Sequence, residues 1–259
     1  MDNPENIHLV VGPPRCASTA FARVLWNNPE IRYYSHEPYE STHYRALDPD
    51  HADAVLADPL DLHTVIPPKD GKKLLVKEMT FQVGKHFPRL LARTAHPVVF
   101  LVRDPRLTIS SRRRIKASHD LPTEFPLTET GWPDLVDQLA HCREHGVEYL
   151  LVDSHDYRTA PGPIFERILS AWDLRFEEDQ LRWRPQPELA LSNHGADYFY
   201  SRVLNSTGIE PPTERIPAFA DFPAENGLRD HVEWATAQYD RMREDGNFVR
   251  PSERSSAAL

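Results

Sequence analysis

Five short apolar segments within the first 152 residues predict the strands of a parallel sheet. They lie at residues 7–11, 31–35, 73–77, 98–102 and 149–152. They are rich in β-branched and aromatic residues and lack strict alternation, which is typical of strands covered on both faces. Because segments of helical periodicity separate them, we expect right-handed crossovers and a three-layer, doubly wound α/β fold with about five parallel strands.

Helical patterns fill the intervals between these strands and continue beyond them. The predicted helices lie at residues 19–27, 83–93, 107–116, 133–145 and 163–172. After about residue 175 the periodicity weakens, and helical patterns remain only at 196–205 and 224–243. We interpret this C-terminal part as a helical cover over the sheet. Residues 1–250 are thus expected to form a single domain, followed by a disordered tail at 251–259.

Composition and charge restrict the classes of partner. The 259 residues carry a formal net charge of −9, so a general nucleic-acid-binding surface is not expected. The two cysteines, Cys16 and Cys142, provide no disulfide framework and favour a reducing cytoplasm. A polar, acidic N-terminus and the lack of a run of about 20 apolar residues predict neither a secretory signal nor a membrane span. We therefore expect a cytoplasmic protein, and the sequence leaves its oligomeric state open.

The loop between the first strand and the first helix has the features of an anion-binding site. The backbone N–H groups of such a loop and the N-terminus of the following helix both attract an anion. The residues assigned to it are Gly12, Pro13, Pro14, Arg15, Cys16, Ala17, Ser18 and Thr19. Ser18 and Thr19 are also expected to cap the helix, and Cys16 to fill the loop. The Gly-Lys-Ser/Thr ending of a nucleoside-triphosphate P-loop is missing, which argues against an ordinary ATPase, and a surface turn is the alternative interpretation.

A second motif, Arg103-Asp104-Pro105, follows the fourth predicted strand. Ser111 lies eight residues after Arg103, inside the next predicted helix. A guanidinium at a strand end and a hydroxyl two turns into the helix can bind the same phosphate. The alternative is a capped strand followed by arginines on a solvated helix face.

These two motifs together resemble those of the sulfotransferase family that uses 3′-phosphoadenosine 5′-phosphosulfate (PAPS) as donor. The resemblance implies a P-loop NTPase-like fold in which residues 12–19 hold the 5′-phosphosulfate, while Arg103 and Ser111 hold the 3′-phosphate. Ser206, Thr207 and Gly208 are similar to a nucleotide-binding element of some bacterial and plant members. The C-terminal Arg-Lys-Gly nucleotide segment of the cytosolic members is not evident.

The resemblance also assigns catalytic roles. Members that sulfate phenols and steroids carry Lys-Thr-His after the third strand, where this chain has Lys77-Glu78-Met79. The chain is closer to members with a glutamate base at the end of the second strand, which makes Glu37 the expected base, with His36 and Glu78 as the other candidates. Arg15 is expected to stabilise the charge of the donor, and Lys77 to reach the transferring group. The alternatives are a structural ion pair of Glu37 with Arg15 or Lys77 and a lysine that merely extends to the sheet edge.

The acceptor is expected to be a small hydroxylated molecule, such as a specialised metabolite, and adenosine 3′,5′-bisphosphate the second product. Candidate acceptor-binding residues are His36, Tyr39, Glu78 and His194. No metal is expected to be required, because the helical spacing of His141, Cys142 and His145 favours an ordinary helix surface over a metal site. Two alternatives stay open, namely a nucleotide-dependent kinase on a related P-loop fold and a non-catalytic adenosine-phosphate-binding protein.

Overall fold

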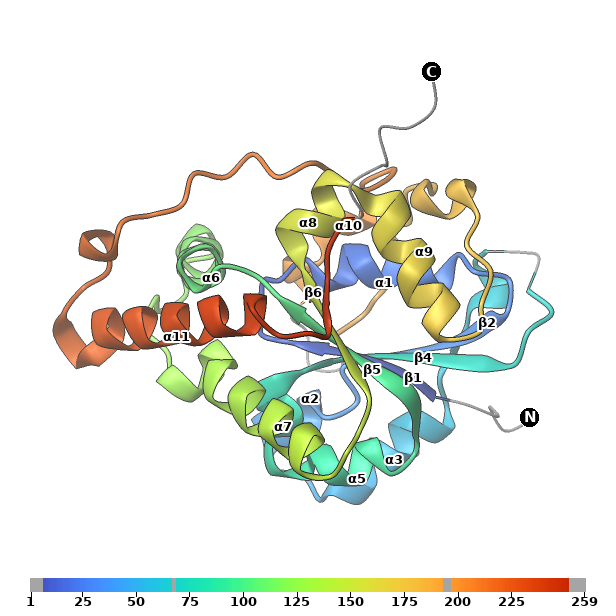
Figure 1. The fold of residues 1–259 in the computed structure, drawn as a ribbon, viewed down its shortest axis with the longest axis horizontal. Coiled ribbons are helices and arrows are strands. Elements are labelled where there is room, and N and C mark those ends of the chain that lie inside the picture. The colour runs from blue at the N-terminus through green and yellow to red at the C-terminus, as the bar shows by residue number, and fades with distance from the viewer. Residues whose placement is uncertain (1–6, 67–68, 193–196, 252–259) are drawn as a thin grey trace.

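The structure, a computed structural model, describes residues 7–66, 69–192 and 197–251 (Figure 1). A seven-stranded sheet crosses the molecule in the order β3-β2-β4-β1-β5-β6-β7. Its central strands, all parallel, are β2 (Ile31–His36), β4 (Lys73–Met79), β1 (Ile7–Gly12), β5 (Thr94–Val102) and β6 (Tyr149–Asp153). They coincide with the five apolar segments, so the predicted doubly wound α/β fold is confirmed. The segments do not predict the two-residue edge strands β3 (Leu60–Asp61), which is antiparallel to β2, and β7 (Phe248–Val249).

Two apolar clusters cover the two faces of the sheet. The alternation along β1 shows the division, because Val10 faces one cluster while Leu9 and Val11 face the other. The first cluster contains residues of α1 (Ser18–Trp26), α8 (Ser154–Thr159) and α9 (Pro161–Ala171). The second contains residues of α5 (Phe87–Leu91), α7 (Trp132–Glu144) and α11 (Leu228–Arg243). Figure 1 shows these two helical layers on opposite sides of the sheet.

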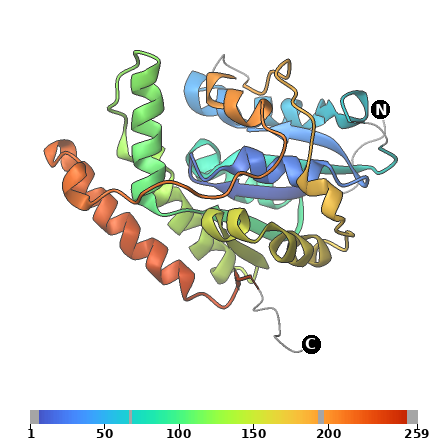
Figure 2. The same cartoon turned by 90° about the horizontal axis from the view of Figure 1, so that it is seen from above.

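The remaining helices are α2 (Glu40–Arg45), α3 (Pro49–Ala57), α4 (Thr80–Val83), α6 (Pro105–Ser118) and α10 (Ser201–Leu204). The helices of the structure differ from the predicted ones in two places. The prediction of one helix at 83–93 is wrong, because Gly84 has a φ of 41° and Phe87 begins the separate helix α5, with Pro88 in its first turn. The helix predicted at 196–205 is reduced to α10 after a short 3₁₀ turn at Asp197–Phe199. Helix α11 lies beside α6 and joins the second layer (Figure 2).

Arg23 fastens two segments of the predicted C-terminal cover to α1, namely 183–192 and 197–208. From here on, these two segments are called the cover. The Arg23 side chain is completely buried. Its Nη1 donates to the carbonyl of Val203 at 2.7 Å, and its Nη2 donates to the carbonyl of Arg184 at 2.8 Å and to Oε1 of Gln186 at 2.9 Å. Burial lowers the pKa of Arg23 to about 10, which leaves it charged at neutral pH. One guanidinium thus connects three parts of the cover to the helix that follows β1.

Among residues 7–66, 69–192 and 197–251, no helix is both long enough and apolar enough to span a bilayer. The predicted tail lies, beyond Pro251, outside the described residues, and so does His194.

Candidate active site

A cavity of about 510 Å³ opens where the central parallel strands end. In doubly wound sheets the carboxyl ends of the strands are the usual place for a ligand. The sequence-predicted residues that line it are Pro14, Arg15, Ala17, Ser18, Thr19, Glu37, Lys77, Arg103, Ser111, Ser206 and Gly208. The fold therefore brings both nucleotide motifs, the expected base and the strand-end lysine into one cavity.

The loop after β1 has the backbone of an anion-binding turn. Gly12 permits the close packing of β1 on β5, because a Cβ at this position would lie 2.6 Å from the carbonyl oxygen of Leu101. Arg15 and Ala17 have φ values of 69° and 57°, and left-handed residues occur in turns whose N–H groups form anion-binding concavities. The prediction that Ser18 and Thr19 cap α1 is wrong, because Ala17 is the N-cap and makes no side-chain bond. The side chains of Ser18 and Thr19 line the cavity instead.

Cys16 does not line the cavity. It is fully buried beneath the loop, and burial raises the pKa of its thiol to about 12. The thiol is therefore neutral and unreactive, in agreement with the prediction that Cys16 fills the loop.

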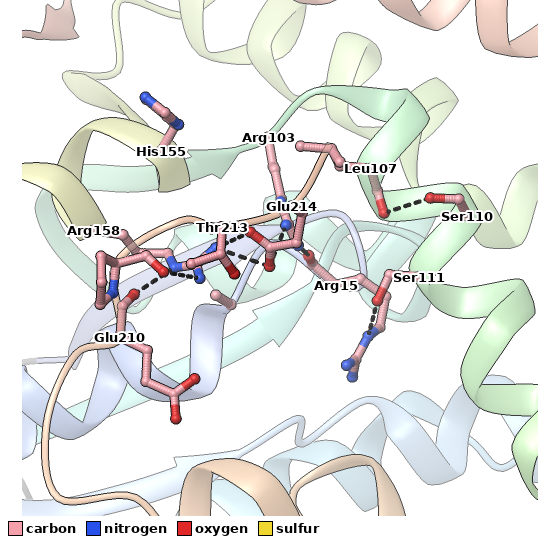
Figure 3. A network of polar contacts seen from close by, with 12 residues as sticks. Arg15, Arg103, Leu107, Ser110, Ser111, His155, Arg158, Glu210, Thr213 and Glu214 are labelled. Atoms are coloured by element: carbon pink, nitrogen blue, oxygen red, sulfur yellow. Dashed lines mark hydrogen bonds and ion pairs between the residues drawn. The ribbon is translucent and has the colours of Figure 1, made fainter. Parts of the chain in front are cut away.

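The two nucleotide motifs contact each other through Arg15. Its Nε donates to Oγ of Ser111 at 3.3 Å, and its own carbonyl accepts from Nη1 of Arg103 at 3.0 Å (Figure 3). Burial and the neighbouring charge of Arg103 lower the pKa of Arg15 to about 10. The guanidiniums of Arg15 and Arg103 consequently concentrate positive charge beside the loop, in a protein whose net charge is negative.

Glu37 lies at the end of β2 in a conformation that a non-glycine residue rarely adopts, with a φ of 50°. Its Oε1 forms an ion pair with Nζ of Lys77 and accepts a hydrogen bond from the Tyr200 hydroxyl at 3.0 Å. Its Oε2 accepts from Nε2 of Gln82 at 3.0 Å. Burial alone would raise the pKa of Glu37, but the attraction of Lys77 and His36 outweighs it and lowers the pKa below its usual range. Glu37 is thus a buried, charged carboxylate with a fixed orientation.

Three other predicted residues, His36, Glu78 and Tyr39, do not line the cavity. Nε2 of His36 is 3.2 Å from Oε1 of Glu37, and burial lowers the pKa of this imidazole. The Glu78 carboxylate accepts from the backbone N–H of Tyr39 at 2.9 Å and of Met79 at 2.7 Å. Of the neighbours Lys77 and Glu78, only Lys77 lines the cavity, as the alternation of a strand predicts. Tyr39 is buried with its ring stacked on His86.

Three residues that the sequence assigns to the nucleotide also do not line the cavity, namely Gly12, Pro13 and Thr207.

Several residues of the site are not identified by sequence reasoning. They are Glu40, Gln82, Arg158, Tyr200 and Glu214, all of which line the cavity. Glu40 directly follows Tyr39, and Tyr200 lies six residues after His194, both of which the sequence assigns to the acceptor, so a signal exists for both. Arg158 and Glu214 lie in segments without a motif, and only the fold brings them to the site.

The rim of the cavity contains Tyr44, Arg114, Ile115, Ser118 and Tyr198. It combines aromatic, apolar and hydroxyl groups with one exposed cation. Within the described ranges, no cluster of three or more His, Cys, Asp or Glu side chains could hold a metal ion.

Comparisons with known proteins give one matching family and solved structures of similar fold. A family model described as "Sulfotransferase domain" matches residues 7–241. The sulfotransferase domain from the curacin biosynthetic pathway is 16% identical, with 92% of this chain and 98% of that domain covered at a TM-score of 0.55. The sulfotransferase domain from the Synechococcus PCC 7002 olefin synthase is 15% identical, with 93% and 96% covered at a TM-score of 0.54. No curated protein matches the chain in sequence.

Proposed function

Because the chain belongs to the sulfotransferase domain family, we propose that it transfers a sulfuryl group from PAPS to the hydroxyl of a small molecule. Adenosine 3′,5′-bisphosphate is the second product. The observation that carries this proposal is a single cavity lined by Arg15, Arg103 and Ser111 together with Lys77 and Glu37. The first three supply donors for phosphate groups, and the last two supply a cation and a base.

The donor nucleotide would use both anion-binding motifs. The loop at residues 12–19 is suited to the 5′-phosphosulfate, because its N–H groups and the N-terminus of α1 attract an anion. Arg103 and Ser111 are suited to the 3′-phosphate, which distinguishes PAPS from ATP. Arg15 belongs to the loop and also contacts Arg103 and Ser111, so it would stabilise charge between the two motifs.

The reaction needs little covalent chemistry from the protein, since sulfuryl transfer resembles phosphoryl transfer in its loose transition state. The acceptor oxygen forms a bond to sulfur, and the bond between sulfur and the bridging oxygen breaks. The electron pair of that bond stays on the 5′-phosphate of the product. Glu37 takes the proton of the acceptor hydroxyl, while Lys77 and Arg15 balance the charge that develops on the leaving phosphate.

The ion pair between Glu37 and Lys77 sets a condition on this mechanism. A carboxylate oxygen that is bound to an ammonium group is a weak base. We propose that Lys77 moves from Glu37 to the transferring sulfuryl group when the donor binds. The departure of this positive charge raises the pKa of Glu37 and makes the carboxylate a better base.

The acceptor would bind between Glu37 and the rim. The aromatic and apolar side chains of Tyr44, Ile115 and Tyr198 suit a small organic molecule, with Arg114 available for an anionic substituent. This surface supports a small hydroxylated acceptor and favours compounds that carry a carboxylate or phosphate next to an apolar skeleton.

Calorimetry with adenosine 3′,5′-bisphosphate and with ADP, each with and without Mg²⁺, tests the donor assignment. We expect the bisphosphate to bind more tightly and without a need for Mg²⁺. Preferential, Mg²⁺-dependent binding of ADP would instead support a kinase. A screen of hydroxylated acceptors with sulfur-labelled PAPS then tests turnover, and bisphosphate binding without transfer to any acceptor would favour a non-catalytic binding protein.

A further inference from the structure

Two arginines from different parts of the fold share the carboxylate of Glu214. Nη2 of Arg103, at the end of β5, lies 2.9 Å from Oε1 of Glu214, and Nη1 of Arg158, on α8, lies 3.2 Å from Oε2 (Figure 3). The two arginine side chains are only 8% and 9% exposed, whereas that of Glu214 is 28% exposed. All three residues line the cavity. A partly exposed acidic side chain therefore connects two buried guanidiniums inside the proposed donor site.

Glu214 belongs to a segment that Arg158 holds in place. Residues 209–218 contain no helix or strand. Nε of Arg158 donates to the carbonyl of Glu210 at 2.9 Å, and its Nη2 donates to the carbonyl of Pro211 at 3.0 Å. The backbone N–H of Thr213 donates to Oε2 of Glu214 at 3.1 Å. The position of Glu214 thus depends on a few polar contacts rather than on regular secondary structure.

The charges of this cluster suit a phosphate better than a carboxylate. Two guanidiniums carry two positive charges, and Glu214 balances one of them. Burial would raise the pKa of Glu214, but the backbone bonding and both arginines lower it to about 2, so the carboxylate is ionised at every working pH. A phosphate monoester close to its dianionic form would balance both arginines and offer more acceptor oxygens than a carboxylate.

The location of the cluster indicates which phosphate of the donor nucleotide would bind to it. Arg103 also donates to the carbonyl of Arg15, whose side chain donates to Ser111, so the cluster is continuous with the residues proposed for the 3′-phosphate. On the basis of the proposed function, we infer that the nucleotide 3′-phosphate replaces the Glu214 carboxylate on Arg103 and Arg158. Arg158 then determines specificity for 3′-phosphorylated nucleotides, and Glu214 is an internal competitor of that phosphate.

Calorimetric binding of adenosine 3′,5′-bisphosphate and of AMP tests this inference, because the two nucleotides differ only in the 3′-phosphate. In Glu214→Gln we expect the bisphosphate to bind about 3- to 10-fold more tightly and AMP as before, since the competitor loses its charge. In Arg158→Met we expect the bisphosphate to bind about 10- to 100-fold more weakly, with a much smaller change for AMP. Glu166→Gln and Arg167→Met, at exposed positions on α9, are the matched controls and should leave both affinities unchanged.

The outcomes separate this inference from the proposed function. If the wild-type protein prefers the bisphosphate but both variants keep the wild-type ratio of affinities, the inference is wrong and the proposed function stands. If Glu214→Gln raises the affinity for both nucleotides equally, Glu214 restricts entry to the cavity in general and the inference is wrong. If the wild-type protein prefers ADP, both fail. Should Arg158→Met not fold, Glu214→Gln alone decides, because it predicts a gain of affinity that no unfolding can produce.

Discussion

The hydroxyl of Tyr200 lies 3.0 Å from Oε1 of Glu37, although 163 residues separate them in the chain. The bond connects the cover to the end of β2 inside the cavity. Without this hydrogen bond the Glu37 carboxylate should be less firmly oriented. A hydrogen bond to a charged group usually contributes roughly 1.5–3 kcal/mol. We expect Tyr200→Phe to lower kcat about 10- to 100-fold without weakening nucleotide binding. Tyr33→Phe, which makes the same chemical change outside the cavity, should have wild-type kinetics.

Replacement of Glu37 by Gln should affect both turnover and stability. Loss of a positioned base lowers transfer by about 10²- to 10⁴-fold. The change also leaves the Lys77 ammonium buried without its carboxylate, which should destabilise the fold by about 3–5 kcal/mol in urea denaturation. The double variant Glu37→Gln/Lys77→Met removes both charges and should recover most of the stability but none of the activity. A double variant as unstable as the single one would contradict this account of the pair.

Two Gly→Ala substitutions should have opposite effects on stability. At Gly12 the new methyl group meets the Leu101 carbonyl, and separation of β1 from β5 should cost roughly 1–3 kcal/mol or more. At Gly162, in the first turn of α9, no atom lies within 4 Å of the added Cβ. There Ala should stabilise by about 0.4–1 kcal/mol, because it restricts the unfolded chain. Thermal or urea denaturation of the two variants measures the difference.

Glu78 should make stability depend on pH between about 4.5 and 8. Burial and the charge of Glu37 raise the pKa of Glu78 to about 8 in the folded chain. In this window the folded state binds more protons than the unfolded state, so the free energy of unfolding should fall as the pH rises. The contribution is complete below pH 4.5 and is lost by the time the pH passes 8. Urea denaturation at pH 5, 6.5 and 8 should show this slope in the wild-type protein and a smaller one in Glu78→Gln; equal slopes would exclude Glu78 as the source.

Arg23→Met should loosen the cover while the sheet stays folded. The variant removes the donors for Val203, Arg184 and Gln186. We expect faster amide hydrogen exchange across residues 183–192 and 197–208, with unchanged protection in β1 and β5. Arg32→Met, which breaks a half-buried ion pair with Asp61 away from the cover, is the control and should leave exchange in the cover unaltered. Uniformly faster exchange in cover and sheet alike would mean that Arg23 stabilises the whole fold.

The central sheet could be predicted from the sequence because each of its strands is buried on both faces and therefore appears as an apolar run. The edge strands could not, since two residues of β3 or β7 give no period and their pairing depends on neighbours distant in the chain. The loop after β1 and Arg103 could be placed because both follow a predicted strand directly. The left-handed backbone of Glu37 and the burial of Glu78 depend on contacts between β2 and β4, which no local pattern encodes.

Arg158 and Glu214 show the limit of such reasoning most clearly. An arginine five residues after the end of β6 and a glutamate in a segment without periodicity resemble ordinary surface residues. They become neighbours only when a segment without helix or strand crosses the cavity. Their charge pairing is a property of the folded chain and not of either local sequence.

The cavity depends on residues from the late part of the chain, 197–214, which has a consequence for biosynthesis. A nascent chain that has emerged as far as residue 192 already contains all five central strands, yet it lacks Tyr200, Ser206 and Glu214. Because chains are made from the N-terminus at about 5–20 residues per second, the sheet can begin to form several seconds before synthesis of the last helix is complete. On the basis of the proposed function, a nucleotide with a 3′-phosphate would meet Arg103 and Arg158 during this interval without competition from Glu214. Under that proposal the nucleotide would be a ligand of the folding chain as well as the donor or product of the finished protein.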